Sequence, residues 1–460
     1  KLDLGNIDFN GDGDPWAARG FDEGTDEFVW YIRRPGTTGW EEIFRLSEDS
    51  YETFVLENID TDQQDSVIVM ANNGDDKAGF WSYSVAEKAF KELIYRRNDV
   101  DVFGVRYHSN KWTNPDTIVG LGWYKDKLHF EYLNEIEGAT YAQLESLIPN
   151  AEYLLINSRS RDGEVLTIYN EGAHDPGTYY LLKDGRLVTV GSKQPLIEPE
   201  NLADVRYITY KARDGKSIPA FITVPHGEPP FPTIVMPHGG PFVQETVIYD
   251  EWSQMFANNG YLVLQPQYRG SQGYGNAFYL AAIDGGGQGG YKMQDDKDDG
   301  ALYLVEQGLA DPERLALYGW SYGGYAALVA ASRTPQIYQC VIAGAAVSDT
   351  IMQVNYYRDQ LRGHGRDQQL NMWTDSISPI KEVEKVNVPI LLIHGSVDQR
   401  VPPAHARKYT KALEDNGKVY EYVELDGADH FYDTLYFEHQ IKLYESMIEY
   451  LKNDCGPGGL

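Results

Sequence analysis

The sequence has little cysteine and no long apolar run. Its two cysteines, Cys340 and Cys455, cannot form a disulfide framework, and neither has the spacing of a metal ligand. Cys340 heads a buried-looking strand, whereas Cys455 lies in the terminal CGPGGL segment, so we expect no bridge between them and leave the redox compartment open. No stretch reaches the roughly 18 apolar residues that a membrane helix needs.

Positive charge is also scarce. The 40 lysines and arginines face 69 aspartates and glutamates, which gives a net charge of -29. Such a surface repels phosphate backbones and anionic lipids, so we expect neither nucleic acid nor a membrane as a partner. The chain begins at Lys1 without a charged-then-apolar leader, so we expect that any export signal was removed or never present.

The first part, residues 1–197, is predicted to be all-β. Its apolar segments are short and rich in aromatic and β-branched residues, and Asp-Gly or Asn-Gly pairs separate them. Examples are 27–32, 65–73, 79–85, 151–163 and 177–190. At roughly 45–50 residues per blade, this part predicts a β-propeller of about four blades, with a helix inserted at 141–150.

The second part, residues 198–455, changes to apolar strands that alternate with helical patterns. After a hairpin signal over 205–225, the predicted strands are 232–238, 261–267, 314–319, 340–345, 389–395 and 419–425. Helical patterns cover 297–308 and 404–417. Continuous apolar strands with intervening helices predict a doubly wound α/β domain with a mostly parallel sheet.

A candidate nucleophile stands inside this second part. The pentapeptide GWSYG (319–323) has the G-x-S-x-G spacing of a nucleophile elbow, between an apolar strand and a helix of small residues. Glycines remove side chains that would clash at such a turn. The pattern therefore predicts Ser321 as the nucleophile, and a Gly-rich turn with an idle serine is the alternative.

A serine nucleophile needs a histidine base and an orienting carboxylate. Asp398 follows the strand 389–395, and His430 follows the strand 419–425, in the order that α/β-hydrolases use. Asp349 is the alternative acid. We interpret His394 as a strand-end residue that shapes the loop of Asp398.

The segment MPHGGPF (236–242) follows the first parallel strand and resembles the H-G-G motif of esterases and peptidases. Bare glycine backbone lets an amide N–H approach a substrate carbonyl, so we assign the oxyanion hole to the amides of Gly240 and Tyr322. A plain turn at 238–240 is the alternative.

The second part as a whole resembles the prolyl oligopeptidase family of serine peptidases, in its acylaminoacyl-peptidase-like and dipeptidyl-aminopeptidase-like branch. The resemblance rests on HGGP, YRGSQGYG, GGYKMQDDKDDGALYLVEQG, DPERLALYGWSYGGYAAL, SPIKEVEKVNVPILLIHGSVDQRVP and DGADHFY.

The resemblance implies a propeller that caps an α/β-hydrolase, short peptides as substrates, no cofactor, and Ser321, Asp398 and His430 as the triad. It also implies that Arg400, two residues after the acid, binds the substrate backbone.

Family propellers usually have seven blades, which about 197 residues cannot hold, so blades are either missing or absent by nature. The family's exported members favour a periplasmic or secreted location, and the oligomeric state stays open, a homo-oligomer included.

One further expectation concerns metal binding. The segment DFNGDGDPW (8–16) has the first half of a calcium-loop spacing, but Arg19 stands where a bidentate glutamate belongs, so we favour an acidic turn and expect no metal.

Three functional hypotheses result. They are a serine peptidase acting on short peptides, a carboxylesterase with the same triad, and a non-catalytic binding module that binds through its propeller.

Overall fold

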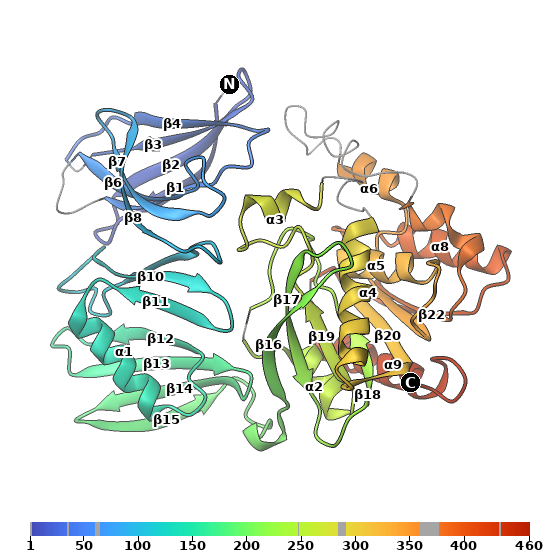
Figure 1. Cartoon of the computed structure of the whole chain (residues 1–460). Coiled ribbons are helices and arrows are strands. Elements are labelled where there is room, and N and C mark those ends of the chain that lie inside the picture. Colours follow the sequence, from blue (N-terminus) through green and yellow to red (C-terminus); the bar gives the residue numbers. More distant parts are fainter. Residues whose placement is uncertain are drawn as a thin grey trace. The chain divides into compact units, whose positions relative to one another are not determined.

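The computed structural model describes residues 2–34, 36–59, 65–246, 248–283, 291–357, 377–431 and 434–460. The chain divides into two compact units (Figure 1). Unit 1 comprises Lys1–Glu200, Thr246–Tyr249 and Gly273–Ala277, and unit 2 comprises Asn201–Glu245, Asp250–Gln272 and Phe278–Leu460. Two short stretches from the second half of the sequence thus group with the β-rich first half.

Unit 1 consists of antiparallel sheets in which strands pair with their neighbours along the chain. The sheets are β1–β4 (Leu2–Phe9, Pro15–Asp22, Glu27–Ile32, Glu41–Ser47), β5–β8 (Phe54–Ile59, Ser66–Ala71, Gly79–Ser84, Ala89–Arg96), β9–β11 (Gly104–Tyr107, Ile118–Tyr124, Leu128–Tyr132) and β12–β15 (Tyr153–Arg159, Val165–Gly172, Asp175–Lys183, Arg186–Ser192). These successive blades confirm the predicted propeller-like domain with fewer than seven blades, counted over the described residues.

Aromatic side chains fill the space between the first two sheets. The rings of Phe44 and Phe54 stack with their centroids 3.9 Å apart, and Trp30 and Tyr83 meet Phe54 edge-on. Turns follow the predicted chemistry, since Asn73 and Asp184 adopt positive φ beside a glycine.

The predicted helix of unit 1 exists but begins earlier than expected. It is α1 (Glu135–Leu147), and the side chain of Asn134 caps it by accepting from the amides of Ile136 and Glu137. Its apolar face packs on the last two sheets through Tyr141 and Leu144.

Unit 2 is built on an eight-stranded sheet of order β16-β17-β19-β18-β20-β21-β22-β23. The strands are β16 (Asp204–Lys211), β17 (Ser217–Val224), β18 (Phe231–Val235), β19 (Leu262–Pro266), β20 (Ala310–Trp320), β21 (Cys340–Gly344), β22 (Ile390–Gly395) and β23 (Tyr420–Leu425). The described α-helices after residue 200 are α2 (Glu251–Asn258), α3 (Asn276–Leu280), α4 (Tyr291–Glu306), α5 (Tyr322–Ala330), α6 (Thr350–Tyr357), α8 (Ala404–Asp415) and α9 (Phe437–Asn453).

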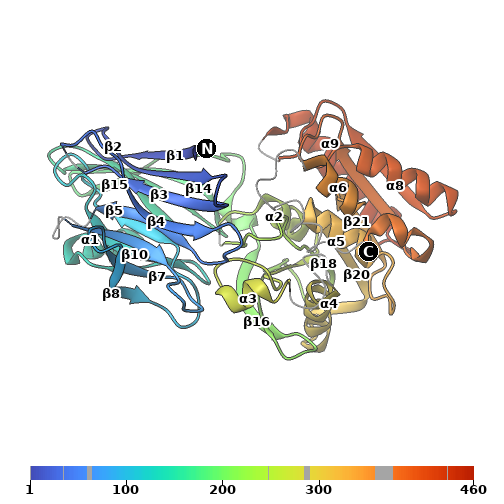
Figure 2. The same cartoon turned by 90° about the horizontal axis from the view of Figure 1, so that it is seen from above.

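The sheet of unit 2 is parallel from β19 onward, and the β16–β17 hairpin adds an antiparallel edge. Helices cover both faces of the sheet (Figure 2). Residues of α2 and α9 belong to the apolar cluster on one face, and residues of α4 and α5 belong to the cluster on the opposite face. This doubly wound arrangement confirms the predicted α/β-hydrolase fold. Because the strands are parallel, the loops that follow β18, β20, β22 and β23 emerge at one edge of the sheet.

The expectation about the cysteines was wrong, because Cys340 and Cys455 form a disulfide. The reason lies in the direction of α9. This helix begins after the loop of His430, at the carboxyl edge of the sheet, and its 17 residues run back about 25 Å to the amino edge. The terminal segment therefore meets the first residue of β21, where both cysteines are fully buried.

Among the helices that the structure describes, none combines the length and the apolar character required to cross a membrane.

Candidate active site

Ser321 lies at the corner between β20 and α5, with φ 61° and ψ -115°. A residue with a side chain rarely adopts positive φ, and the nucleophile elbow of α/β-hydrolases is such a strained corner. A Cβ on Gly319 would lie 2.3 Å from the carbonyl carbon of Gly323, and a Cβ on Gly323 would lie 2.3 Å from the oxygen of Pro237. The glycine spacing is therefore a steric requirement of this turn.

The backbone around Ser321 is held from both sides. Its amide donates to the carbonyl of Gly344 on β21 (2.9 Å), and its own carbonyl accepts from the amide of Tyr325 in α5 (3.0 Å). The indole N–H of Trp320 donates to the carbonyl of His430 (2.8 Å). This bond ties the loop after β23 to the residue that precedes the serine.

The loops after β22 and β23 bring a carboxylate and an imidazole together. His430 Nδ1 lies 2.7 Å from Asp398 Oδ2, and both residues are buried. Asp398 Oδ1 accepts from the amides of Arg400 (2.8 Å) and Val401 (2.7 Å). With its proton on Nδ1 directed at Asp398, His430 keeps Nε2 free to accept a proton.

Burial alone would raise the pKa of Asp398, but hydrogen bonds outweigh it. His394, His430 and the amide of Val401 stabilise the charged form and hold the pKa of this carboxyl below its usual range. Asp398 is therefore ionised at neutral pH, as a residue that stabilises an imidazolium must be.

The neighbouring candidates have other partners. His394 Nε2 lies 2.8 Å from the carbonyl oxygen of Val401 and 3.4 Å from Asp398 Oδ2, so this side chain braces the loop of the acid. Asp349 Oδ2 instead lies 2.6 Å from Lys408 Nζ, and its Oδ1 accepts from the amide of Met352. The structure thus pairs His430 with Asp398, and it engages Asp349 elsewhere.

The HGG loop lies against the elbow. A Cβ on Gly239 would be 3.3 Å from the carbonyl oxygen of Trp320 and 3.5 Å from the Cβ of Ser321. Gly240 has φ +113°, a conformation that favours glycine, and Tyr322 is the first residue of α5. Two backbone segments, the HGG loop and the start of α5, therefore flank Ser321.

His238 fixes this loop from beneath. Its Nδ1 lies 2.7 Å from the carbonyl oxygen of Gly239, which can only accept, so with the proton on Nδ1 the imidazole donates to this oxygen. Its Nε2 lies 2.9 Å from Ser271 Oγ, and the hydroxyl of Tyr268 donates to the His238 carbonyl (2.8 Å). Burial lowers the pKa of His238 to about 4, so the ring is neutral at pH 7.

The direction of one peptide follows from this clamp. The carbonyl of Gly239 and the N–H of Gly240 belong to the same planar peptide group and point in opposite directions. By holding the oxygen, His238 sets the direction of the Gly240 N–H.

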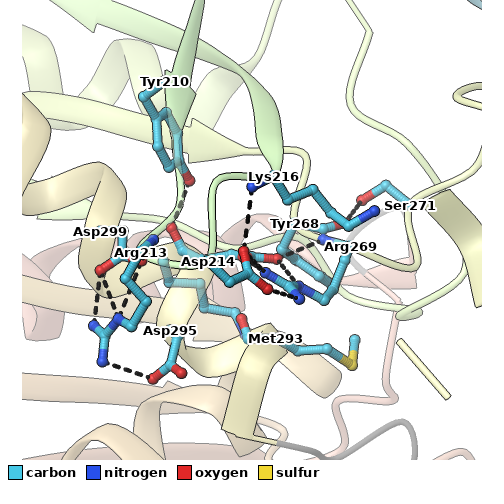
Figure 3. A network of polar contacts seen from close by, with 12 residues as sticks. Tyr210, Arg213, Asp214, Lys216, Tyr268, Arg269, Ser271, Met293, Asp295 and Asp299 are labelled. Carbon is cyan, nitrogen blue, oxygen red and sulfur yellow. Dashed lines mark hydrogen bonds and ion pairs between the residues drawn. The ribbon is translucent and has the colours of Figure 1, made fainter. Parts of the chain in front are cut away.

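Tyr268 and Ser271 are positioned in turn by the residue between them, Arg269 (Figure 3). Its buried guanidinium contacts Asp296 on α4 (2.6 Å) and Asp214 in the β16–β17 turn (2.8 Å). Asp296 Oδ2 also accepts from the backbone amide of Arg269 (2.8 Å). The corner that clamps His238 is thus anchored to both a helix and a hairpin.

Arg400 lies on the exposed surface. Its guanidinium carbon is 5.3 Å from the ring centre of Tyr357, and its carbonyl oxygen accepts from the Tyr357 hydroxyl (2.6 Å). No ion pair of Arg400 with another described residue is present.

The sequence interpretation missed the residues that brace the site: Tyr268, Ser271, Arg269 and the indole of Trp320. The motif YRGSQGYG signalled that this corner matters. Nothing in its spacing showed that its hydroxyls meet His238, which is 30 or more residues away.

The fold and these contacts define the class of unit 2: an α/β-hydrolase domain with a nucleophile elbow and a paired histidine and aspartate. Residues 249–458 match the sequence model of the prolyl oligopeptidase family. Over these residues the chain is therefore similar to the peptidase domain of that family.

Curated relatives carry related names. The chain is 27% identical over 313 residues to dipeptidyl aminopeptidase BIII of Pseudoxanthomonas mexicana, covering 64% of this chain and 45% of the relative. It is 30% identical over 226 residues to the acylamino-acid-releasing enzyme of Rattus norvegicus, covering 46% of this chain and 30% of the relative. The chain thus matches half or less of the length of these relatives.

Solved structures share the fold. A puromycin-hydrolyzing peptidase of Mycobacterium tuberculosis has a TM-score of 0.72 at 18% identity, covering 97% of this chain and 68% of that one. An acylaminoacyl peptidase of Pyrococcus horikoshii has a TM-score of 0.67 at 18% identity, covering 96% and 69%.

The acidic segment 8–16 forms a turn. Asn10 Oδ1 accepts from the amides of Asp12 (3.2 Å) and Asp14 (2.8 Å) within it. Over the part of the chain that the structure describes, no group of three or more His, Cys, Asp or Glu side chains is placed to hold a metal ion.

Proposed function

We propose that the chain is a serine peptidase that hydrolyses short peptides through an acyl-enzyme on Ser321. The observation that supports the proposal is the 2.7 Å contact between His430 Nδ1 and Asp398 Oδ2, in which an imidazole lies beside a carboxylate. The carbonyl of His430 also accepts from the indole N–H of Trp320, the residue before Ser321. A binding module needs no such pair.

In the proposed first step, Ser321 Oγ attacks the carbonyl carbon of the scissile peptide bond. His430 Nε2 takes the hydroxyl proton, and Asp398 stabilises the resulting imidazolium. The amides of Gly240 and Tyr322 donate to the oxyanion. When the C–N bond breaks, the imidazolium gives its proton to the leaving amine, and the acyl group remains on Ser321.

In the second step, water attacks the acyl-enzyme and His430 takes a proton from it. The tetrahedral intermediate again places its oxyanion on the two amides. Collapse releases the carboxylic acid and returns the proton to Ser321 Oγ, so the enzyme ends in its starting state.

The names of the relatives support short peptides as the substrate class, since they denote release of dipeptides or of acylated amino acids. We further propose that Arg400 binds a carbonyl oxygen of the substrate. Its exposed guanidinium, with no ion pair to a described residue, supports this role.

The test is release of p-nitroaniline from a panel of aminoacyl, acylaminoacyl and dipeptidyl anilides, run beside p-nitrophenyl butyrate. Ser321→Ala is the control for every substrate. We expect anilide turnover that the substitution abolishes, and the best anilide defines the substrate type.

Ester turnover without anilide turnover would replace the peptidase with a carboxylesterase. Activity that survives Ser321→Ala would contradict the assignment of the nucleophile. Absence of any turnover, with no reaction of Ser321 toward a fluorophosphonate, would favour the non-catalytic binding module.

A further inference from the structure

The helix α4 carries the segment QDDKDD (294–299), in which one lysine stands between two pairs of aspartates. Every one of these aspartates has an arginine partner: Asp295 and Asp299 contact Arg213 (3.1 and 2.7 Å), Asp296 contacts Arg269 (2.6 Å), and Asp298 contacts Arg333 (3.3 Å). Lys297 differs from its neighbours, because it makes no ion pair with any residue that the structure describes.

Lys297 points into the domain and is 1% exposed. Its Nζ donates to the carbonyl of Met293 (2.9 Å) and to Gln294 Oε1 (3.0 Å), both on α4. The same Nζ lies 4.5 Å from the ring centre of Tyr268 and 5.5 Å from that of Tyr322. The ammonium group therefore faces two aromatic rings instead of a carboxylate.

These two rings belong to the two halves of the candidate oxyanion site. Tyr322 contributes its own backbone amide, and Tyr268 donates its hydroxyl to the carbonyl of His238. Gln294 links the lysine to the same site, because its Nε2 lies 3.4 Å from the Tyr322 hydroxyl. Figure 3 shows Tyr268 beside Arg269 and Met293 in this region.

We propose that Lys297 is a positioning residue of the oxyanion site: its buried ammonium holds the rings of Tyr268 and Tyr322 and supplies positive potential where negative charge develops on the substrate. This inference rests on the proposed function, since it needs Ser321 to form a tetrahedral intermediate.

The physical basis is a buried charge without a counter-ion in contact. A cation over an aromatic face is attracted by the ring, and the attraction grows when the cation is desolvated. Fixed charges in a water-excluded site act more strongly on a developing oxyanion than they do in water. As a guide to the size of the effect, Coulomb's law for a unit charge at about 10 Å and an effective dielectric constant of about 20 gives roughly a tenfold change in rate.

The charge on Lys297 responds to pH. Burial lowers the pKa of Lys297 to about 7, although Asp296 and Asp298 favour its charged form. Arg333 opposes the charged form, and Asp295 favours it. His238, on the loop after β18, is neutral over this range. The ammonium is therefore present below about pH 7 and is lost above it.

The experiment measures kcat and KM for the best anilide from about pH 6 to 9, together with the rate at which a fluorophosphonate labels Ser321, read by intact-protein mass spectrometry. Because His430 must be neutral to take the proton of Ser321, the unmodified protein is compared with Lys297→Met at each pH. We expect Lys297→Met to lower kcat and the labelling rate roughly tenfold at pH 6, with KM unchanged, and we expect this difference to disappear as pH rises through about 7.

Two variants control this result. Lys297→Arg keeps a charge that does not titrate, so the ratio of its rate to that of Lys297→Met should stay constant from pH 6 to 9. Lys216→Met removes another lysine that faces an aromatic ring, Phe278, at 5.7 Å, and it should behave as the unmodified protein does.

If Lys297→Met fails to fold, a constant ratio of rates between the unmodified protein and Lys297→Arg from pH 6 to 9 would overturn the inference. Equal profiles for Lys297→Met and the unmodified protein would overturn it too. If anilides are not cleaved while Ser321 is still labelled, the proposed substrate class fails, but the labelling rates still decide the role of Lys297.

Discussion

The two units fill their interiors with different chemistry. Unit 1 relies mainly on aromatic contacts, and among its described residues it buries only three charged side chains, Arg106, Glu137 and Asp175. Arg106 lies against the rings of Phe130 (3.7 Å) and Tyr141 (3.8 Å). Unit 2 buries ionisable groups near Ser321, at positions 238, 269, 296, 297, 398 and 430. Burying such groups costs stability unless each has partners. The difference indicates that the interior of unit 2 is arranged around a reaction, whereas that of unit 1 is arranged around packing.

The largest effect should come from Asp398→Asn. An amide cannot stabilise the imidazolium of His430 and favours the wrong tautomer, so we expect kcat to fall about 10⁴-fold. Steady-state hydrolysis of the best anilide measures this, and the midpoint of urea unfolding should change little by comparison. The matched control is Asp349→Asn, which removes the alternative acid and should retain most activity. A larger loss for Asp349→Asn would reverse the assignment of the acid.

Removing the disulfide should have the largest effect on stability. The bridge joins residues 115 positions apart, so the double variant Cys340→Ala/Cys455→Ala should lose about 4–5 kcal/mol of unfolding free energy. Urea unfolding of the oxidised protein and the double variant measures this difference. If both cysteines of the unreduced, unfolded protein react with iodoacetamide, the bridge is not formed.

The sequence could predict those candidate site residues whose position depends on the order of the strands along the chain and on the loops that follow them. Ser321 and Asp398 each follow a strongly apolar strand, and His430 follows a strand of mixed apolar and acidic residues. Parallel strands place the positions that follow them at one edge of the sheet. Local signals were enough, because the elbow needs its glycines and the acid needs only a loop after β22.

The sequence could not predict contacts that depend on the direction of a helix or on the packing of loops from different strands. The bridge to Cys455 requires the direction of α9, and the clamp on His238 requires a loop from another strand. In the sequence, Lys297 is one charge among four aspartates of a helix. It is buried together with Asp296 and Asp298, and what distinguishes it is that arginines pair with these aspartates, whereas Lys297 has no ion pair with a described residue.

The packing of unit 1 can be tested at Phe54, which is buried and touches Trp30, Phe44 and Tyr83. Phe54→Ala should cost about 3–5 kcal/mol, because it leaves a cavity among rings. Hydrogen exchange should rise in the first two sheets, while fluorophosphonate labelling of Ser321 keeps its rate. Phe9→Ala, at a site 61% exposed, is the control and should change little. Slower labelling in Phe54→Ala would contradict the division of roles between the units.

The clamp beneath the oxyanion loop can be tested with His238→Phe. Phenylalanine keeps a ring stacked on Tyr268, where the centroids are 4.3 Å apart, but it cannot donate to the carbonyl of Gly239. We expect kcat to fall about 10²–10³-fold with KM nearly unchanged, as for the loss of one oxyanion donor. Unchanged kcat would show that the Gly240 peptide needs no support from the imidazole.

The last effect concerns acid stability, and it should appear in unit 2. Burial lowers the pKa of His238 to about 4 and that of His405 to about 3, both from 6.5. Between pH 6.5 and 4 the unfolded chain binds protons that the folded chain does not, so stability falls as pH falls through this window. For His238 alone the loss approaches about 3 kcal/mol. Hydrogen exchange at pH 7 and pH 4.5 should show unit 2 opening before unit 1, and His238→Phe should reduce the difference. Opening that begins in the aromatic sheets of unit 1 would show that packing, and not buried charge, sets the acid limit of this protein.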